Sequence, residues 1–147
     1  MSLAMNTDEL MDYMASVFPQ VSDDFAIEEL SEDRLIMRLK VAHRHLRPGG
    51  TVSGPSMFAL ADCGVYAMVL ARVGRQGLAV TSSCSMDFMR KPEGGVDMLA
   101  EVRLLKLGKL LAVGDVLMRS EGSDKIVARA TMTYSIPPAG SVAANAG

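Results

Sequence analysis

The stretch that decides the fold reads GPSMFALADCGVYAMVLA and runs from Gly54 to Ala71. Residues that favour helices dominate it, and Pro55 suits the first helical turn, where its missing N–H costs nothing. Apolar residues occur on every side of this helix, so we expect most of its surface to be buried. Gly74 and Gly77 follow and are expected to end the helix. The stretch therefore predicts one long central helix that other elements must enclose.

Short segments on both sides of this helix predict the enclosing elements. Asn6 and Glu9 have the spacing of a capping box, which predicts a short N-terminal helix that Pro19 ends. Alternating apolar and polar residues predict a β-hairpin from residues 25–30 and 35–41. Beyond the central helix, long strands are predicted at residues 78–89, 96–106, 110–120 and 126–136. Because short loops join these four strands, we expect each to pair antiparallel with the next, as a meander.

The order of elements favours an α+β fold in one domain. A helix that is buried all round needs a curved antiparallel sheet of about six strands wrapped around it. The 147 residues suit a single domain, which we place at residues 1–136. Residues 137–147 are rich in Ala, Gly, Ser and Pro and are predicted to form a disordered tail. The free edges of such a sheet are suited to pairing with a second copy of the chain.

Composition argues against several classes of function. A net charge of −2 gives no general attraction to nucleic acid or to an anionic membrane, and Trp is absent. The only cysteines, Cys63 and Cys84, form no CxxC pair, so no zinc site or disulfide framework is predicted. The apolar run from Met57 to Ala71 is interrupted by Asp62 and is short for a membrane span. The start of the chain lacks the pattern of a signal peptide, so we expect a cytoplasmic protein.

Asp62 and Gly54 are the candidate catalytic residues. Asp62 is the only charged residue between Pro48 and Ala71, and a carboxylate in apolar surroundings is costly unless it is paired or has a function. The alternative is that Asp62 lies on the one solvated edge of the helix. Gly54 stands at the start of the helix, where its N–H is unpaired and can hold an oxyanion. The alternative is that Gly54 only serves the turn before Pro55.

A longer motif resembles a known family. The segment RPGGTVSGP at residues 47–55, followed by ALAD at residues 59–62, resembles the signature of hotdog-fold acyl-CoA thioesterases. The most similar group is the PaaI-like and 4-hydroxybenzoyl-CoA thioesterases, and the resemblance continues at Thr81 and at residues 88–92, 107–110 and 127–130. It implies the hotdog fold, in which the sheet wraps around the central helix.

The resemblance also implies roles for individual residues. Gly54 would donate its N–H to the oxyanion, and Asp62 would act as nucleophile or general base. Thr81 would help to position water. Arg90 and Lys91 would meet the phosphates of CoA, unless they are ordinary surface charges.

Three positions depart from the family's motif. Ser53 replaces the His of His-Gly-Gly, Pro55 replaces the second Gly, and Arg47 replaces an Asn or Gln. Ser53 is a third candidate catalytic residue, since its hydroxyl could substitute for the His; the alternative is that it caps the helix. Arg47 either binds a carboxylate or phosphate of the substrate or pairs with Asp62 across a subunit boundary.

The function that the resemblance implies is hydrolysis of a small or medium acyl-CoA thioester to a free acid and CoA. The protein would be a homodimer or homotetramer in which Asp62 faces Gly54 of the other subunit, with no cofactor and no metal, since CoA belongs to the substrate. The apolar floor of the site is expected from Met57, Phe58, Leu60, Ala61 and strand residues near Met86. A binding protein without turnover and an acyl-CoA dehydratase are the alternatives, although no His lies near Gly54 for the latter.

His43 and His45 are too few for a metal site, and we expect a solvated or interface role for them.

Overall fold

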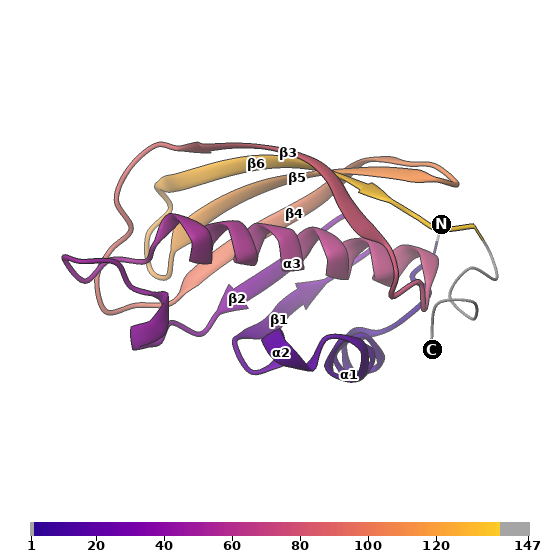
Figure 1. Ribbon diagram of the computed structural model, residues 1–147, viewed down its shortest axis with the longest axis horizontal. Coiled ribbons are helices and arrows are strands. Elements are labelled where there is room, and N and C mark those ends of the chain that lie inside the picture. The colour runs from indigo at the N-terminus through magenta and orange to yellow at the C-terminus, as the bar shows by residue number, and fades with distance from the viewer. Residues whose placement is uncertain (1, 139–147) are drawn as a thin grey trace.

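A computed structural model describes residues 2–138, so residues 139–147 of the predicted tail lie outside the described residues. Helices α1 and α2 open the chain and α3 lies in its middle, while six strands make up most of the rest (Figure 1). The helices are α1 (Thr7–Val17), α2 (Pro19–Ser22) and α3 (Gly54–Val73), with a 3-10 turn at His43–His45. The strands are β1 (Phe25–Leu30), β2 (Leu35–Leu39), β3 (Val80–Phe88), β4 (Met98–Leu107), β5 (Leu111–Ser120) and β6 (Ile126–Ser135).

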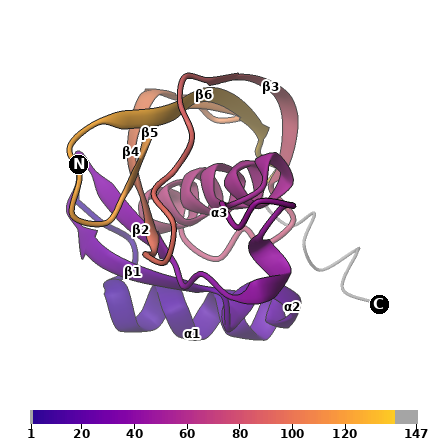
Figure 2. The ribbon, with the colours of Figure 1, turned by 90° about the vertical axis from the view of Figure 1, so that its left-hand side faces the viewer.

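The strands form one antiparallel sheet in the order β1-β2-β4-β5-β6-β3. Figures 1 and 2 show the sheet curving around α3, with α1 lying beside β1 on the far side from β3. The prediction of a curved antiparallel sheet wrapped around one long central helix is confirmed, and the fold is the hotdog fold.

The position of β3 corrects the predicted meander. β3 does not pair with β4; it pairs with β6 at the edge of the sheet, from Val80 opposite Ser135 to Phe88 opposite Ala128. The connection from β3 to β4 covers residues 89–97, longer than the ~2–5 residues of a hairpin loop. It can therefore cross to the middle of the sheet, where β4 pairs with β2 and β5. One long edge of the sheet is left to β3.

Two glycines let α3 lie close against the sheet. A Cβ on Gly64 would come within 2.8 Å of Val102 Cγ2, and one on Gly114 would come within 2.9 Å of Val65 Cγ1. Both neighbours are fully buried, so neither position has room for a side chain without displacement. Glycine at these two contacts therefore allows the axis of α3 to lie close to the strands.

The length and apolar composition of α3 are those of a helix that could span a membrane. Yet 67% of its most apolar window is buried inside the protein. A core helix has the same composition because it is surrounded by apolar side chains instead of lipid. The sheet supplies those side chains here.

Helix α1 packs on the domain through its buried side chains and through a hydrogen bond near its end. Asn6 and Glu9 form the predicted capping box, and Leu10 and Met14 are buried against the core. The N–H of Gly77, in the loop after α3, donates to the hydroxyl of Tyr13 at 2.9 Å. These contacts hold the end of α1 beside α3.

Candidate active site

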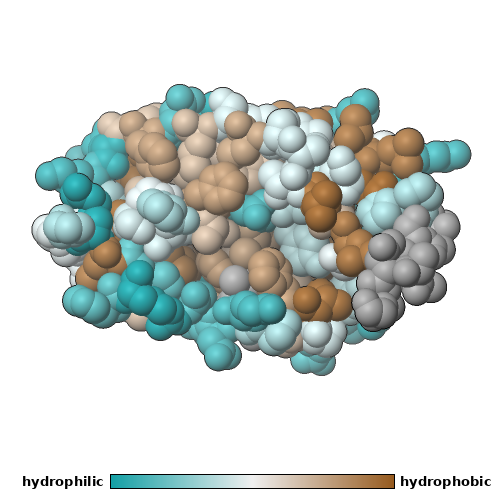
Figure 3. All heavy atoms as spheres, in the orientation of Figure 1, coloured by the Kyte–Doolittle hydropathy of each residue, from teal (hydrophilic) through white to brown (hydrophobic). Residues whose placement is uncertain are grey.

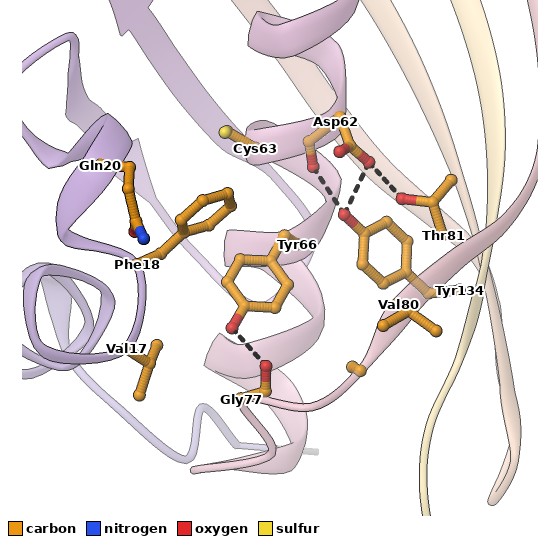
Figure 4. Close-up of a pocket in the computed structure, with 11 residues that line it drawn as sticks. Val17, Phe18, Gln20, Asp62, Cys63, Tyr66, Gly77, Val80, Thr81 and Tyr134 are labelled. Atoms are coloured by element: carbon orange, nitrogen blue, oxygen red, sulfur yellow. Dashed lines mark hydrogen bonds between the residues drawn. The ribbon is translucent and has the colours of Figure 1, made fainter.

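Asp62 is held by hydroxyl groups from two strands. The carboxylate Oδ1 accepts a hydrogen bond from Tyr134 Oη of β6 at 2.7 Å and another from Thr81 Oγ1 of β3 (Figure 4). Tyr134 Oη also lies 3.1 Å from the backbone oxygen of Asp62. Among the described residues, no hydrogen bond is made to Oδ2, so this oxygen is the one available to a ligand.

Burial keeps the groups around Asp62 protonated. The pKa of the Tyr134 hydroxyl is raised, chiefly by burial and then by the negative charge of Asp62. The same two causes raise the pKa of Cys63 to about 12, and burial raises the pKa of Tyr66 to about 12. At neutral pH, therefore, Tyr134 is a hydrogen-bond donor and Cys63 is a neutral thiol that packs like a small apolar side chain.

A cavity of about 380 Å³ opens beside Asp62. Its walls come from α3, from the loop that follows α3 and the start of β3, from the end of β6, and from the end of α1 together with α2 (Figure 4). The lining residues are Val17, Phe18, Gln20, Asp62, Cys63, Tyr66, Gly77, Ala79, Val80, Thr81 and Tyr134. Apolar side chains also gather over the middle of the face that Figure 3 shows. The cavity can therefore hold an apolar group next to a carboxylate.

A second cavity, of about 450 Å³, lies at the N-terminus of α3. It is lined by Arg47, Thr51, Val52, Gly54, Met57, Phe88, Met89, Arg90, Lys91 and Pro92. The structure thus brings together Gly54 and the three cations that the sequence had marked as substrate-binding. Helix N-termini and clustered cations both favour an anionic ligand, so this cavity suits phosphate groups.

Local geometry explains how the residues of this second cavity are held. Gly49 and Gly50 have φ values of 103° and 86°, a conformation that favours glycine, and they turn the chain so that Arg47 lies beside the helix. Ser53 caps the helix, since its Oγ accepts from the N–H of Ser56 at 3.3 Å. Of the two roles considered for Ser53, the cap is the one that the contacts record.

Gly54 and Asp62 lie in different cavities. They are eight residues apart on one straight helix, which separates them by about 12 Å. A carbonyl oxygen within hydrogen-bond distance of Gly54 N–H therefore lies out of reach of Asp62 in the same protomer.

Several predicted residues lie elsewhere than expected. Leu60 and Ala61 are fully buried in the core and cannot form the floor of a site. Phe58 is 40% exposed on α3 and lines neither cavity. His45 is not solvated: its ring is buried, Nδ1 accepts from the N–H of Ala42 at 2.8 Å and Nε2 lies 3.3 Å from Asp24 Oδ2. Within residues 2–138, no three His, Cys, Asp or Glu side chains form a metal-binding cluster.

Sequence reasoning missed the aromatic residues of the Asp62 cavity, Phe18, Tyr66 and Tyr134. For Tyr134 a signal was present. The inward face of β6 contains Ala128, Ala130 and Met132 at every second position, and Tyr134 continues that alternation toward α3. Phe18 gives no comparable signal, because only the path of α1 brings it next to α3.

Comparisons with known proteins point to one family. A family model described as thioesterase superfamily matches residues 49–127. A crystal structure of a candidate thioesterase from Silicibacter sp. TM1040 is 61% identical and superposes with a TM-score of 0.88, covering 94% of this chain and 96% of that one. Acyl-coenzyme A thioesterase 13 of Mus musculus is 25% identical over 90% of this chain and 95% of its own length. A variant of the phenylacetic acid degradation protein PaaI from Thermus thermophilus is 28% identical with a TM-score of 0.68, over 81% and 99% of the two chains.

Proposed function

This chain belongs to the thioesterase superfamily, and we propose that it hydrolyses an acyl-CoA thioester to a free acid and CoA. The observation that carries the proposal is the carboxylate of Asp62, which lines a largely apolar cavity and is held through Oδ1 by two hydroxyl donors, while Oδ2 accepts no hydrogen bond from the described residues. Because Oδ1 is held in place, the carboxylate has a fixed orientation, in which Oδ2 can take a proton from water or attack a carbonyl carbon. The name of the mouse relative supports CoA as the carrier of the acyl group.

The two cavities suit the two halves of such a substrate. Arg47, Arg90 and Lys91 surround the Gly54 cavity and would pair with the phosphates of CoA. The Asp62 cavity would take the acyl group, because its walls are mostly apolar. The thioester would then lie where the Gly54 cavity of one protomer meets the Asp62 cavity of a second copy, with its carbonyl oxygen toward Gly54 N–H and its carbonyl carbon toward Asp62.

The chemistry follows from this placement. Gly54 N–H, at the positive end of α3, would stabilise the negative charge that develops on the carbonyl oxygen. As general base, Oδ2 of Asp62 would take a proton from water while the water oxygen bonds to the carbonyl carbon. The C–S bond then breaks, and the leaving thiolate of CoA takes the proton back from Asp62. As nucleophile, Oδ2 would itself bond to the carbon and expel the thiolate, and water would hydrolyse the resulting anhydride.

Because Gly54 and Asp62 lie too far apart in one protomer, a single thioester would contact both only if a second copy of the chain contributed to the site. We propose a homodimer in which Gly54 of one protomer faces Asp62 of the partner subunit. Strand β3 is the natural contact, since it is an edge strand and its ends expose Val80 and Phe88 at 58% and 54%. An unpaired edge of this kind pairs readily with the same strand of another molecule. Such a contact would bring two α3 helices together and complete two sites.

A panel of acyl-CoA substrates with detection of the released thiol tests this function. Wild type should release thiol, and Asp62→Asn should lose about 10²- to 10⁴-fold in kcat, because the amide is neither base nor nucleophile. Asp124→Asn, at an exposed position in the β5–β6 loop, is the matched control and should keep the wild-type rate. Full turnover by Asp62→Asn would exclude this mechanism. Acyl-CoA binding with no hydrolysis by wild type would show a binding protein instead.

A further inference from the structure

We infer that Phe18 sets the length of the acyl group that the Asp62 cavity accepts, and that this group is uncharged. The inference rests on the proposed function, since it assigns the acyl group to that cavity. Phe18 comes from the end of α1, far in sequence from the motif around Gly54, and its ring forms one wall of the cavity (Figure 4).

The polar atoms of the cavity walls are largely occupied by the protein itself. Tyr66 Oη donates to the backbone oxygen of Gly77 at 2.7 Å, and the hydroxyls of Tyr134 and Thr81 donate to Asp62. The tyrosines therefore offer ring carbons to a ligand instead of hydroxyls, and the buried Cys63 adds an uncharged thiol. Among residues 2–138 no Lys, Arg or His lines the cavity, and Gln20 supplies the one side-chain amide of its lining. An amide can donate a hydrogen bond to a distal carboxylate but offers no opposite charge, so the carboxylate would lose more from its hydration than the cavity returns.

The depth of the cavity is limited along α3. Asp62 and Tyr66 are one helical turn apart, which gives about 6 Å along the helix axis. At that depth Phe18 meets Tyr66 edge to face, with ring centroids 6.3 Å apart and planes at 88°. Tyr66 in turn packs on Tyr134, with centroids 6.0 Å apart. The three rings form a row from Tyr134, which binds Asp62, through Tyr66 to Phe18. On this arrangement, an acyl chain that follows the row from Asp62 past Tyr66 would meet the Phe18 ring.

The wall is held in place by α1. The N–H of Phe18 donates to the backbone oxygen of Met14 at 2.7 Å, and Pro19 restricts the backbone that follows. Met14 is buried in the core and Tyr13 accepts a hydrogen bond from Gly77, the residue that also binds Tyr66. The ring itself is 37% exposed, so its truncation should leave the domain folded.

The experiment is a series of straight-chain substrates from butanoyl-CoA to dodecanoyl-CoA. Wild type should show a length above which kcat/KM falls. Phe18→Ala should move that limit to longer chains and raise kcat/KM about tenfold for the first chain that wild type rejects. Phe18→Trp, with a larger ring, should move the limit to shorter chains. Leu117→Ala is the matched control, because Leu117 is 39% exposed on the outer face of β5 and does not line the cavity. The inference would be overturned if both Phe18 variants kept the wild-type length limit. It would also be overturned if kcat/KM changed by the same factor for every chain length.

A binding series separates this inference from the proposed function. S-alkyl-CoA thioethers of the same lengths cannot be hydrolysed, and their affinities can be measured by calorimetry. If wild type cleaves no acyl-CoA but Phe18→Ala extends the length that binds, the proposed hydrolysis fails and the inference stands. If wild type cleaves acyl-CoA and neither series changes in the Phe18 variants, the inference alone fails. Wild type should also bind a neutral chain at least about tenfold better than its ω-carboxylate counterpart, and equal affinity would contradict an uncharged acyl group.

Discussion

Tyr134 Oη lies 2.7 Å from Oδ1 of Asp62, and this contact joins β6 to the middle of α3. The tyrosine is 3% exposed, and its pKa is raised by burial and by the charge of Asp62. Its hydroxyl therefore stays protonated throughout the neutral range and donates a hydrogen bond. Thr81 of β3 binds the same oxygen. Three elements that are distant in sequence thus orient a single carboxylate.

Tyr134→Phe should lower kcat about 10- to 100-fold and leave KM nearly unchanged. A hydrogen bond to a charged group contributes about 1.5–3 kcal/mol, and here it acts on the carboxylate and not on the bound substrate. Tyr13→Phe, which removes a hydroxyl that binds Gly77 and no other residue among 2–138, should keep kcat. Steady-state kinetics across these variants checks the prediction, and a pure KM effect in Tyr134→Phe would contradict it.

Removal of the Gly54 N–H should abolish most of the activity without unfolding the protein. Gly54→Pro deletes the donor at the first helical position, which tolerates proline, and Ser53 already has the extended backbone that precedes proline (φ −75°, ψ 157°). Loss of one oxyanion donor should cost about 10²- to 10³-fold in kcat. Gly54→Ala retains the N–H, and its Cβ would meet Phe88 at an ordinary 3.5 Å. Equal loss in both variants would mean that the N–H is not the cause.

Two inactive variants should restore activity when they are mixed in one dimer. A protomer with Asp62→Asn keeps Gly54, and a protomer with Gly54→Pro keeps Asp62, so their mixed dimer contains one intact site if each site spans two subunits. Random assortment of equal amounts makes half the dimers mixed, and total activity should reach about a quarter of wild type. Co-expression with two affinity tags checks this. Persistently inactive mixed dimers would show that each site lies within one protomer.

Gly114→Ala should destabilise the fold by about 1–3 kcal/mol. The added methyl would lie 2.9 Å from Val65 Cγ1, and the β-branched, fully buried Val65 cannot turn away. Gly94→Ala, with nothing within 4 Å of its Cβ, is the control and should change stability little. Urea denaturation followed by circular dichroism measures both, and equal stability of the two variants would be the contrary result.

Ser53→Ala should cost about 1 kcal/mol of stability and change kcat only a few-fold. The hydroxyl caps α3 by accepting from Ser56 N–H, so its loss removes a cap and not a reacting group. Ser53→Asp should recover the stability because a carboxylate also caps a helix N-terminus. A loss of kcat as large as that of Asp62→Asn would instead assign chemistry to Ser53.

Local patterns in the sequence determined the secondary structure and the candidate motif. The run from Gly54 to Ala71 predicted α3, Asn6 and Glu9 predicted the cap of α1, and alternation predicted the hairpin of β1 and β2. Each of these depends on residues a few positions apart, whose preferences act through neighbouring backbone and side-chain contacts. The isolated acidic residue in an apolar helix, Asp62, could be recognised for the same reason.

Only the tertiary structure decided how these pieces meet. The pairing of β3 with β6, the contact of Tyr134 with Asp62 and the wall that Phe18 forms all join residues far apart in the chain. Such contacts follow from how the sheet closes around α3, and no local periodicity specifies them. The same packing buried Leu60 and Ala61, and it gave Gly54 and Asp62 different cavities. The sequence by itself thus named Gly54 and Asp62 and, through the rise of one helix, the distance between them, while the walls around each were decided by how distant strands and loops pack on α3.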